Sequence, residues 1–187
     1  ALEQRTVKKG SWRTVDLAYT ALFTVLLTVC TWISVPVPPV PFTLQTFAVF
    51  AALGTLGGRR GTYAVGAYLL LGLAGAPVFS GFQGGAGVLL GATGGYILGF
   101  LASAALYWAI TARLGQRTAV KAAAMALGLA VCYAFGTAWF LTVYARTAGP
   151  VGLWAALGMC VFPFVVPDLV KLALALALSR RLAGRLR

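Results

Sequence analysis

The sequence of 187 residues contains no histidine and only three acidic residues, Glu3, Asp16 and Asp168. Histidine is the commonest metal ligand and proton shuttle, so its absence removes the usual metal and acid–base chemistry. The sequence also lacks a G-x-x-x-x-G-K-[S/T] nucleotide loop, a Gly-x-Ser-x-Gly nucleophile elbow and a pair of neighbouring carboxylates. We therefore expect no catalytic residue, no metal and no cofactor, and predict that the chain is not an enzyme.

Charged residues are scarce, at 10% of the chain against 60% hydrophobic residues. The mean hydropathy is +0.90, and the apolar stretches approach the roughly 20 helical residues that span a hydrocarbon layer of about 30 Å. Cysteines 30, 132 and 160 have no C-x-x-C spacing and stand in apolar surroundings, so we expect them to be packing residues. The composition predicts an all-α integral membrane protein.

The net charge of +12 is distributed in a way that indicates membrane topology rather than nucleic-acid binding. Thirteen of the 15 basic residues form four short clusters between apolar runs, namely Arg5, Lys8, Lys9 and Arg13; Arg59 and Arg60; Arg113, Arg117 and Lys121; and Arg180, Arg181, Arg185 and Arg187. Basic clusters of this kind mark cytoplasmic loops and attract anionic lipids of the inner leaflet. We expect the lipid bilayer as a partner and no nucleic acid.

Six membrane-spanning helices are predicted, at residues 15–35, 42–56, 62–74, 96–111, 119–143 and 167–178. Six crossings with both termini in the cytoplasm place all four basic clusters on one side. The single membrane domain then covers 15–181, between basic cytoplasmic tails at 1–14 and 182–187. Pro167 is predicted to be the first residue of the last helix, where its missing N–H costs nothing, and we expect the apolar segment 149–166 to lie partly along the outer interface.

A glycine-rich segment at 75–95 separates the third and fourth predicted helices, with eight glycines and no charge in 21 residues. Irregular backbone this apolar is tolerated near a membrane only where it is buried in protein or lines a cavity, because its N–H and C=O groups need partners. We therefore predict a capping or re-entrant loop. The prolines between 36 and 41 predict an uncharged turn on the same side, since proline cannot continue a helix.

Asp168 and Lys171 are the ionisable residues predicted to lie deep in the membrane. Twelve helical residues separate Asp168 from Arg180 at the inner boundary, or about 18 Å, and Lys171 follows on the same helix face. Such groups are costly in lipid and usually mark a ligand or ion site, although the pair could also simply neutralise itself in the bundle core. Asp16, in contrast, is expected to stabilise the first turn of the first helix.

The candidate site around Asp168 and Lys171 combines hydrogen-bonding and apolar side chains. Its expected polar members are Gln45, Gln83, Thr93 and Tyr96, and its expected apolar walls are Phe79, Phe82 and tryptophans. A glutamine within a span, such as Gln45, could equally serve helix packing. The combination would suit a small amphipathic molecule with a carboxylate and an amide-like head.

Four stretches of the sequence, at 35–46, 75–82, 84–96 and 163–171, resemble the BioY family in order and composition. They contain Val-Pro-Val-Pro-Pro-Val-Pro-Phe-Thr-Leu-Gln-Thr, Gly-Ala-Pro-Val-Phe-Ser-Gly-Phe, Gly-Gly-Ala-Gly-Val-Leu-Leu-Gly-Ala-Thr-Gly-Gly-Tyr and Pro-Phe-Val-Val-Pro-Asp-Leu-Val-Lys. BioY proteins are the biotin-specific substrate-capture (S) components of energy-coupling factor (ECF) transporters. Val166 and Pro167 stand where the family often has Pro-Gly, and Ala92 replaces a frequent proline.

The resemblance implies high-affinity biotin binding at the extracellular side of a multi-pass protein in a bacterial cell membrane. It implies as partners a transmembrane coupling subunit and two cytoplasmic ATPases, which would carry out any ATP hydrolysis. It also implies that Asp168 and Lys171 contact biotin, as do Gln83 and neighbouring loop residues. Lys171 is expected to meet an anionic or carbonyl oxygen and Asp168 a ureido N–H, while the end of biotin that each meets stays open.

The full predicted biotin site consists of Asp168, Lys171, Gln83, Phe79, Gln45, Thr93 and Tyr96. The family's first helix usually offers an Ala-x-x-x-Ala face to the coupling subunit, and the nearest equivalent here is Thr20, Thr24 and Thr28. Two alternatives remain open from the sequence. The chain could be an S component for another vitamin, or a solitary biotin carrier that works without ATPase partners.

Overall fold

The structure is a computed structural model that describes residues 13–182. The predicted basic tails, 1–14 and 182–187, therefore lie almost wholly outside the described residues. Thr14 is the first residue of α1 and Leu182 the last residue of α8.

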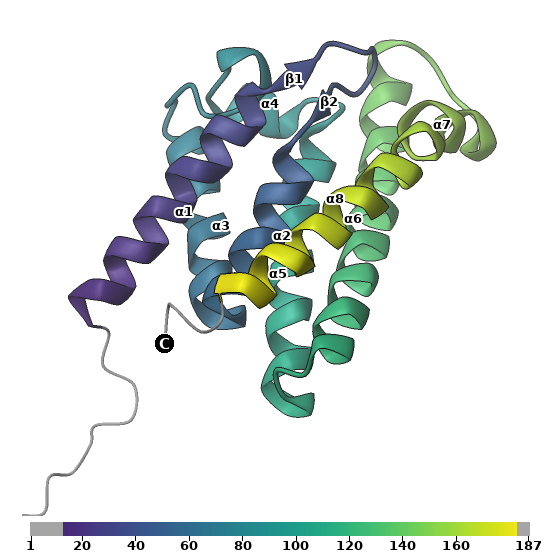
Figure 1. Cartoon of the computed structure of the whole chain (residues 1–187). Coiled ribbons are helices and arrows are strands. Elements are labelled where there is room, and N and C mark those ends of the chain that lie inside the picture. The colour runs from purple at the N-terminus through teal and green to yellow at the C-terminus, as the bar shows by residue number, and fades with distance from the viewer. Residues whose placement is uncertain (1–12, 183–187) are drawn as a thin grey trace, which may run out of the picture.

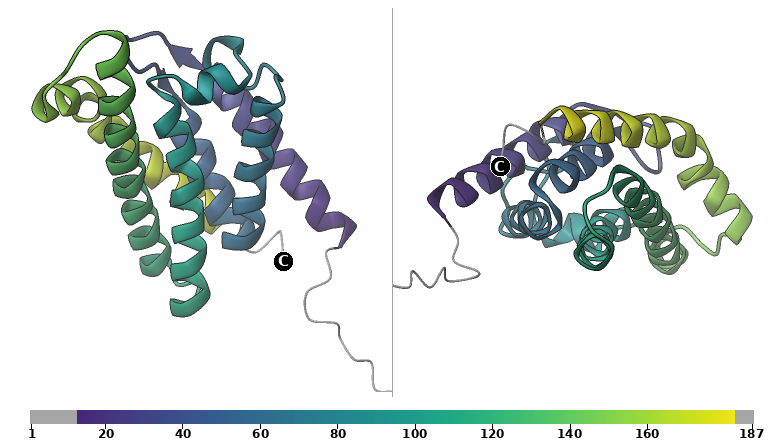
Figure 2. Two further views of the ribbon diagram at one scale, coloured as in Figure 1. Left: turned by 180° about the vertical axis from the view of Figure 1, so that it is seen from behind. Right: turned by 60° about the horizontal axis from the view of Figure 1, so that its bottom comes forward.

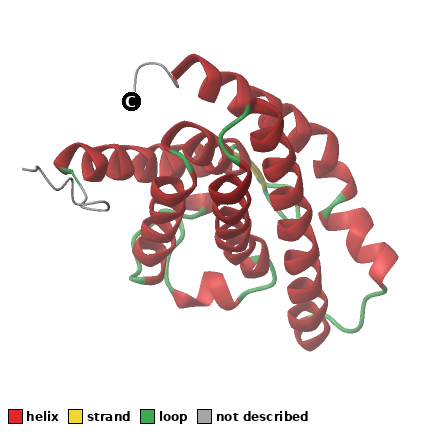
Figure 3. Ribbon diagram, turned by 90° about the horizontal axis from the view of Figure 1, so that it is seen from below, coloured by secondary structure: helices red, strands yellow, loops and turns green. Residues whose placement is uncertain are grey.

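The described chain is helical apart from short connections and one pair of two-residue strands (Figure 3). In order, the elements are α1 (Thr14–Trp32), β1 (Ser34–Val35), β2 (Phe42–Thr43), α2 (Gln45–Leu56), α3 (Gly58–Leu73), η1 (Ser80–Phe82), α4 (Ala86–Leu90), α5 (Gly94–Leu114), α6 (Thr118–Thr147), α7 (Leu153–Cys160) and α8 (Phe162–Leu182). The strands pair antiparallel, with Ser34 opposite Thr43 and Val35 opposite Phe42. The proline-rich turn at 36–41 connects them, as predicted.

Several helix boundaries differ from the prediction. The strands β1 and β2 take residues predicted for the ends of the helices at 15–35 and 42–56, and α6 continues to Thr147 rather than ending at 143. The expected turn at 57–61 is reduced to Gly57, whose positive φ of 83° breaks the chain between α2 and α3, so α3 begins at Gly58 rather than at 62. The last helix begins at Phe162, and Pro167 lies inside it. The break falls instead at Val161, where φ is −122° and ψ is −58°. Membrane helices tolerate an internal proline when neighbouring groups satisfy the freed carbonyl.

Within residues 13–182, four helices, α1, α5, α6 and α8, are long and apolar enough to cross a membrane. The apolar helix α2 has only 12 residues, or about 18 Å of helix. Ten of its residues are buried, among them Val49, Phe50 and Leu53. Helices α1, α3, α5 and α8 all contact it, so α2 forms the centre of the bundle (Figure 2).

The two ends of the bundle differ in their connections. The α2–α3 and α5–α6 turns and the free ends of α1 and α8 lie toward the lower end in Figure 1. The β1–β2 hairpin, the connection between α3 and α5, and α7 lie at the upper end (Figure 1). The described basic clusters belong to the lower end. Asp16 also lies there, in the first turn of α1 as predicted, and pairs with Arg60 at 2.7 Å.

Candidate functional site

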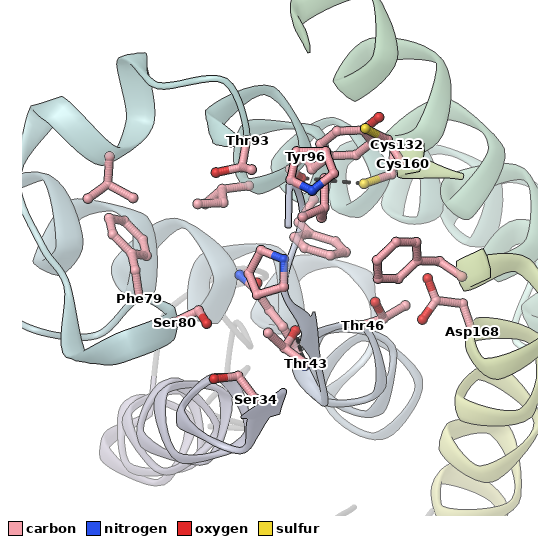
Figure 4. A pocket seen from close by; sticks show the side chains of 18 of the residues that line it. Ser34, Thr43, Thr46, Phe79, Ser80, Thr93, Tyr96, Cys132, Cys160 and Asp168 are labelled. Atoms are coloured by element: carbon pink, nitrogen blue, oxygen red, sulfur yellow. Dashed lines mark hydrogen bonds between the residues drawn. The ribbon is translucent and has the colours of Figure 1, made fainter. Parts of the chain in front are cut away.

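A cavity of about 490 Å³ is lined in part by the β1–β2 hairpin and the glycine-rich loop (residues 75–93), which lie at the upper end of the bundle in Figure 1. Its size is typical of small-molecule sites. Its walls come from the β1–β2 hairpin, α2, the glycine-rich loop, α5, α6, α7 and α8. Figure 4 shows the side chains converging on this space. All seven residues predicted for the ligand site line it: Gln45, Phe79, Gln83, Thr93, Tyr96, Asp168 and Lys171.

Asp168 and Lys171 form a buried ion pair on the cavity wall. Lys171 Nζ lies 2.8 Å from Asp168 Oδ1, and the exposed fractions of the two residues are 5% and 4%. The three-residue spacing on α8 places both side chains on one helix face. The pair is a charge-assisted hydrogen bond held away from bulk water.

Three other groups bind this ion pair. The Tyr133 hydroxyl on α6 donates to Asp168 Oδ2 at 2.7 Å. Lys171 Nζ donates to the carbonyl of Thr43 at 2.6 Å and lies 4.0 Å from the centre of the Phe42 ring, a cation–π contact. The two charged side chains thus connect β2, α6 and α8. These contacts fix the orientation of Asp168 and Lys171 in the cavity wall.

Gln45 lies at the start of α2 and is connected to α1 by a chain of hydrogen bonds. Its Nε2 donates to the Tyr68 hydroxyl at 3.1 Å, which donates to Thr31 Oγ1 at 3.3 Å, and Thr31 donates to the Leu27 carbonyl at 2.8 Å. The packing role that the sequence left open for Gln45 is therefore present, and the side chain also lines the cavity.

The glycine-rich loop forms one side of the cavity and contains η1 and α4 rather than irregular backbone throughout. The backbone N–H of Phe79 donates to the Gln83 carbonyl at 2.9 Å, and the buried Phe79 ring packs edge-on against Tyr68 with centroids 5.5 Å apart. Trp32 Nε1, at the end of α1, donates to the Pro77 carbonyl at 2.8 Å. These contacts hold the loop against α1 and α3.

The first turn of α5 forms another part of the cavity wall. Thr93 precedes the helix and Tyr96 lies in its first turn. The Tyr96 hydroxyl is 3.1 Å from Thr137 Oγ1 on α6, so its ring is fixed between the two helices. Thr93 and Tyr96 therefore contribute to the wall as the sequence predicted.

Residues 4–187 match the model of the BioY family. The chain belongs to the BioY family. It is 41% identical to a biotin transporter BioY of Thermotoga maritima, over 89% of this chain and 95% of that one. It is 40% identical to a probable biotin transporter BioY of Pyrococcus horikoshii, over 90% of this chain and 96% of that one.

The fold also agrees with that of a solved structure. The crystal structure of the S-component for biotin from an ECF-type ABC transporter superposes with a TM-score of 0.80. The two chains are 29% identical, and the superposition covers 91% of each. The helix arrangement described above is thus that of an S component.

The structure does not support the docking role predicted for Thr20, Thr24 and Thr28. All three are buried, with exposed fractions of 9%, 4% and 8%. Each hydroxyl donates to the carbonyl four residues earlier, and Thr24 Oγ1 also lies 3.2 Å from the Ala64 carbonyl of α3. The threonine stripe packs inside the subunit, where a partner cannot reach it.

Some of the apolar residues predicted to line the ligand site do not line the cavity. Phe82 does not line the cavity; it is 65% exposed, and its ring lies tilted by 36° against that of Trp32 with centroids 5.0 Å apart. Within the described residues, no tryptophan lines the cavity. The walls that the prediction missed include Val40, Phe100, Leu129, Tyr133 and Phe164.

Tyr133 is the most informative of the missed residues, because it touches Asp168 directly. Its signal in the sequence was weak. A tyrosine within an apolar span needs a partner for its hydroxyl, but the sequence alone does not name that partner.

Proposed function

We propose that this BioY-family chain captures biotin as the substrate-specific subunit of an ECF-type transporter and supports biotin uptake. The observation that carries the proposal is the buried Asp168–Lys171 pair, which faces the cavity beneath the glycine-rich loop. A charge pair at this depth is costly and would serve no packing purpose that apolar residues could not serve. The relatives named as biotin transporters, which align with about nine-tenths of this chain, support biotin as the ligand.

The proposal includes a topology of six crossings by α1, α2, α3, α5, α6 and α8, with both termini in the cytoplasm. Two observations support it. The described basic clusters belong to the start of α1, the α2–α3 and α5–α6 turns and the end of α8, which lie at one end of the bundle (Figure 1), as cytoplasmic loops do. The hairpin and the glycine-rich loop that line the cavity lie at the other end. With this orientation in a bacterial cell membrane, the cavity would open to the outside, from which the vitamin arrives.

A transmembrane coupling subunit and two ATPases would be the partners, with any ATP hydrolysis in the ATPases. We place the docking surface for the coupling subunit on the exposed face of α1, where Ala18 and Ala21 are flanked by Leu22, Val25 and Val29. Small residues let a partner helix approach closely. This face replaces the buried threonine stripe in the proposal.

Replacing Ala21 with tryptophan should prevent assembly with the coupling subunit without weakening biotin binding, because the bulky ring would hold a partner helix away from α1. Co-purification with the coupling subunit and ATPases, together with biotin titration, checks this. The matched control is Ala130→Trp, also exposed but on α6, on the other side of the bundle. Normal assembly of the Ala21→Trp variant would exclude this docking surface.

Competition for labelled biotin tests the ligand against the other vitamins. We expect unlabelled biotin to displace the label and a large excess of thiamine or riboflavin to leave it bound. Displacement of the label by either of those vitamins at a lower concentration than unlabelled biotin requires would indicate an S component for a different vitamin. Reconstitution of the purified chain in liposomes tests whether the protein is a solitary carrier. Biotin uptake by such liposomes in the absence of the ATPases would support that alternative.

A further inference from the structure

The amide of Gln45 ends a chain of buried hydrogen bonds that begins on α1. The other members of this chain are Thr31 on α1 and Tyr68 on α3, each with an exposed fraction of 1%, against 6% for Gln45. Gln45 lines the cavity, whereas Thr31 and Tyr68 do not. Two hydroxyl groups behind the cavity wall therefore act on an amide within it.

Each hydroxyl in this chain has a single hydrogen, so the direction of one bond determines the direction of the next. Thr31 donates its hydrogen to the Leu27 carbonyl at 2.8 Å, so its Oγ1 atom can only accept from Tyr68. The Tyr68 hydroxyl donates to Thr31 Oγ1 at 3.3 Å, so its oxygen can only accept from Gln45. Gln45 must therefore present its NH2 group to Tyr68, with Nε2 at 3.1 Å from the hydroxyl oxygen.

This chain selects one of the two orientations open to the Gln45 amide. An amide turned by 180° keeps its shape while its oxygen and nitrogen exchange places. The other orientation would place the amide oxygen against the Tyr68 oxygen, which has no hydrogen left to donate. In the selected orientation, Gln45 Oε1 has no hydrogen-bond partner among residues 13–182. This oxygen is thus free to accept a hydrogen bond from a molecule in the cavity.

We propose that Thr31 and Tyr68 are positioning residues that hold Gln45 as a hydrogen-bond acceptor toward the cavity. They act through the Gln45 amide and do not touch the ligand. The cavity then selects a ligand that has an N–H or O–H donor at this point and disfavours one that has only an acceptor there. This inference rests on the proposed function, and biotin meets the requirement because its ureido ring carries N–H donors.

Replacement of Thr31 by valine should reverse the direction of the chain. Without Thr31 Oγ1, the Tyr68 hydroxyl can donate to Gln45, which favours the amide oxygen toward Tyr68 and the NH2 group toward the cavity. A ligand N–H would then meet another N–H. We expect calorimetry to show a loss of affinity for biotin of about tenfold, as for one lost hydrogen bond. Thr31→Ser keeps the hydroxyl and should bind like the parent.

Thr28→Val is the matched control for Thr31→Val. Thr28 is also buried on α1 and also donates to a carbonyl four residues earlier, that of Thr24 at 3.0 Å, but it is not part of the chain to Gln45. Its replacement should leave biotin affinity unchanged. Thr31→Val combined with Gln45→Met should bind biotin as Gln45→Met alone does, because the effect of Thr31 passes through the amide.

Parental biotin affinity in a folded Thr31→Val variant would overturn the inference. Equal losses in Thr31→Val, Thr31→Ser and Thr28→Val would also overturn it, since they would indicate a general loosening of α1. A further loss when Thr31→Val is added to Gln45→Met would do the same. Failure of the parent to bind biotin at all would instead refute the proposed function, so the two failures are distinguishable.

Discussion

Replacement of Lys171 by methionine should lower the affinity for biotin by about 100-fold or more, roughly 3 kcal/mol of binding free energy. The variant removes a donor at the cavity wall and leaves the Asp168 carboxylate buried without its partner at 2.8 Å. Breaking a buried pair from one side is more costly than removing both charges. It also releases the Thr43 carbonyl, which Lys171 holds at 2.6 Å. Calorimetry in detergent gives the affinity, and thermal unfolding reports any loss of stability.

Lys121→Met is the matched control for this variant. Lys121 also donates to a backbone carbonyl, that of Gly54 at 2.8 Å, but it lies outside the cavity wall. Its replacement should leave biotin affinity unchanged. Equal biotin affinity in the parent and in a folded Lys171→Met variant would remove Lys171 from the binding site.

Replacement of Gly84 by alanine should weaken biotin binding about tenfold to 100-fold, because overpacking against rigid atoms costs roughly 1–3 kcal/mol. A Cβ at this position would lie 2.3 Å from the carbonyl oxygen of Ala76 and 2.8 Å from that of Gly75. Both contacts are with backbone, so the two arms of the glycine-rich loop would have to separate. That movement would displace Phe79 and Gln83, which lie between the arms and line the cavity.

Gly87→Ala in the same loop is the control for Gly84→Ala. Gly87 lies in α4, is exposed and has nothing within 4 Å of an added Cβ, so its replacement should leave biotin affinity at the parental value. Competition binding on both variants, together with their thermal unfolding, makes the comparison. If Gly84→Ala bound biotin as tightly as Gly87→Ala, the loop would not be part of the binding surface.

The sequence was most informative where a residue was out of place in an apolar chain. A membrane-spanning segment rarely contains an aspartate and a lysine, and an aqueous loop is rarely as apolar as the glycine-rich segment. The ligand-site residues predicted from these two features all line one cavity. Phe42 and the Thr43 carbonyl could not be found in this way. Thr43 lies 128 residues before Lys171 in the chain, and only folding brings β2 beside α8.

The wrong predictions also have physical causes. In a membrane, the inner and outer faces of a helix are both apolar, so the threonine spacing on α1 did not reveal that Thr20, Thr24 and Thr28 face inward. Local bonds to the preceding turn satisfy their hydroxyls, so the three threonines can pack inside the bundle. At Pro167, a rule for helix starts gave the wrong boundary because α8 accommodates the proline in its interior.

The most direct test of the account is titration of the purified, folded parent chain with biotin in detergent by calorimetry. We expect tight binding of biotin, since the described residues form a cavity with the buried Asp168–Lys171 ion pair in its wall. The absence of binding heat, in a sample whose thermal unfolding is cooperative and unaffected by biotin, would contradict biotin capture by this chain.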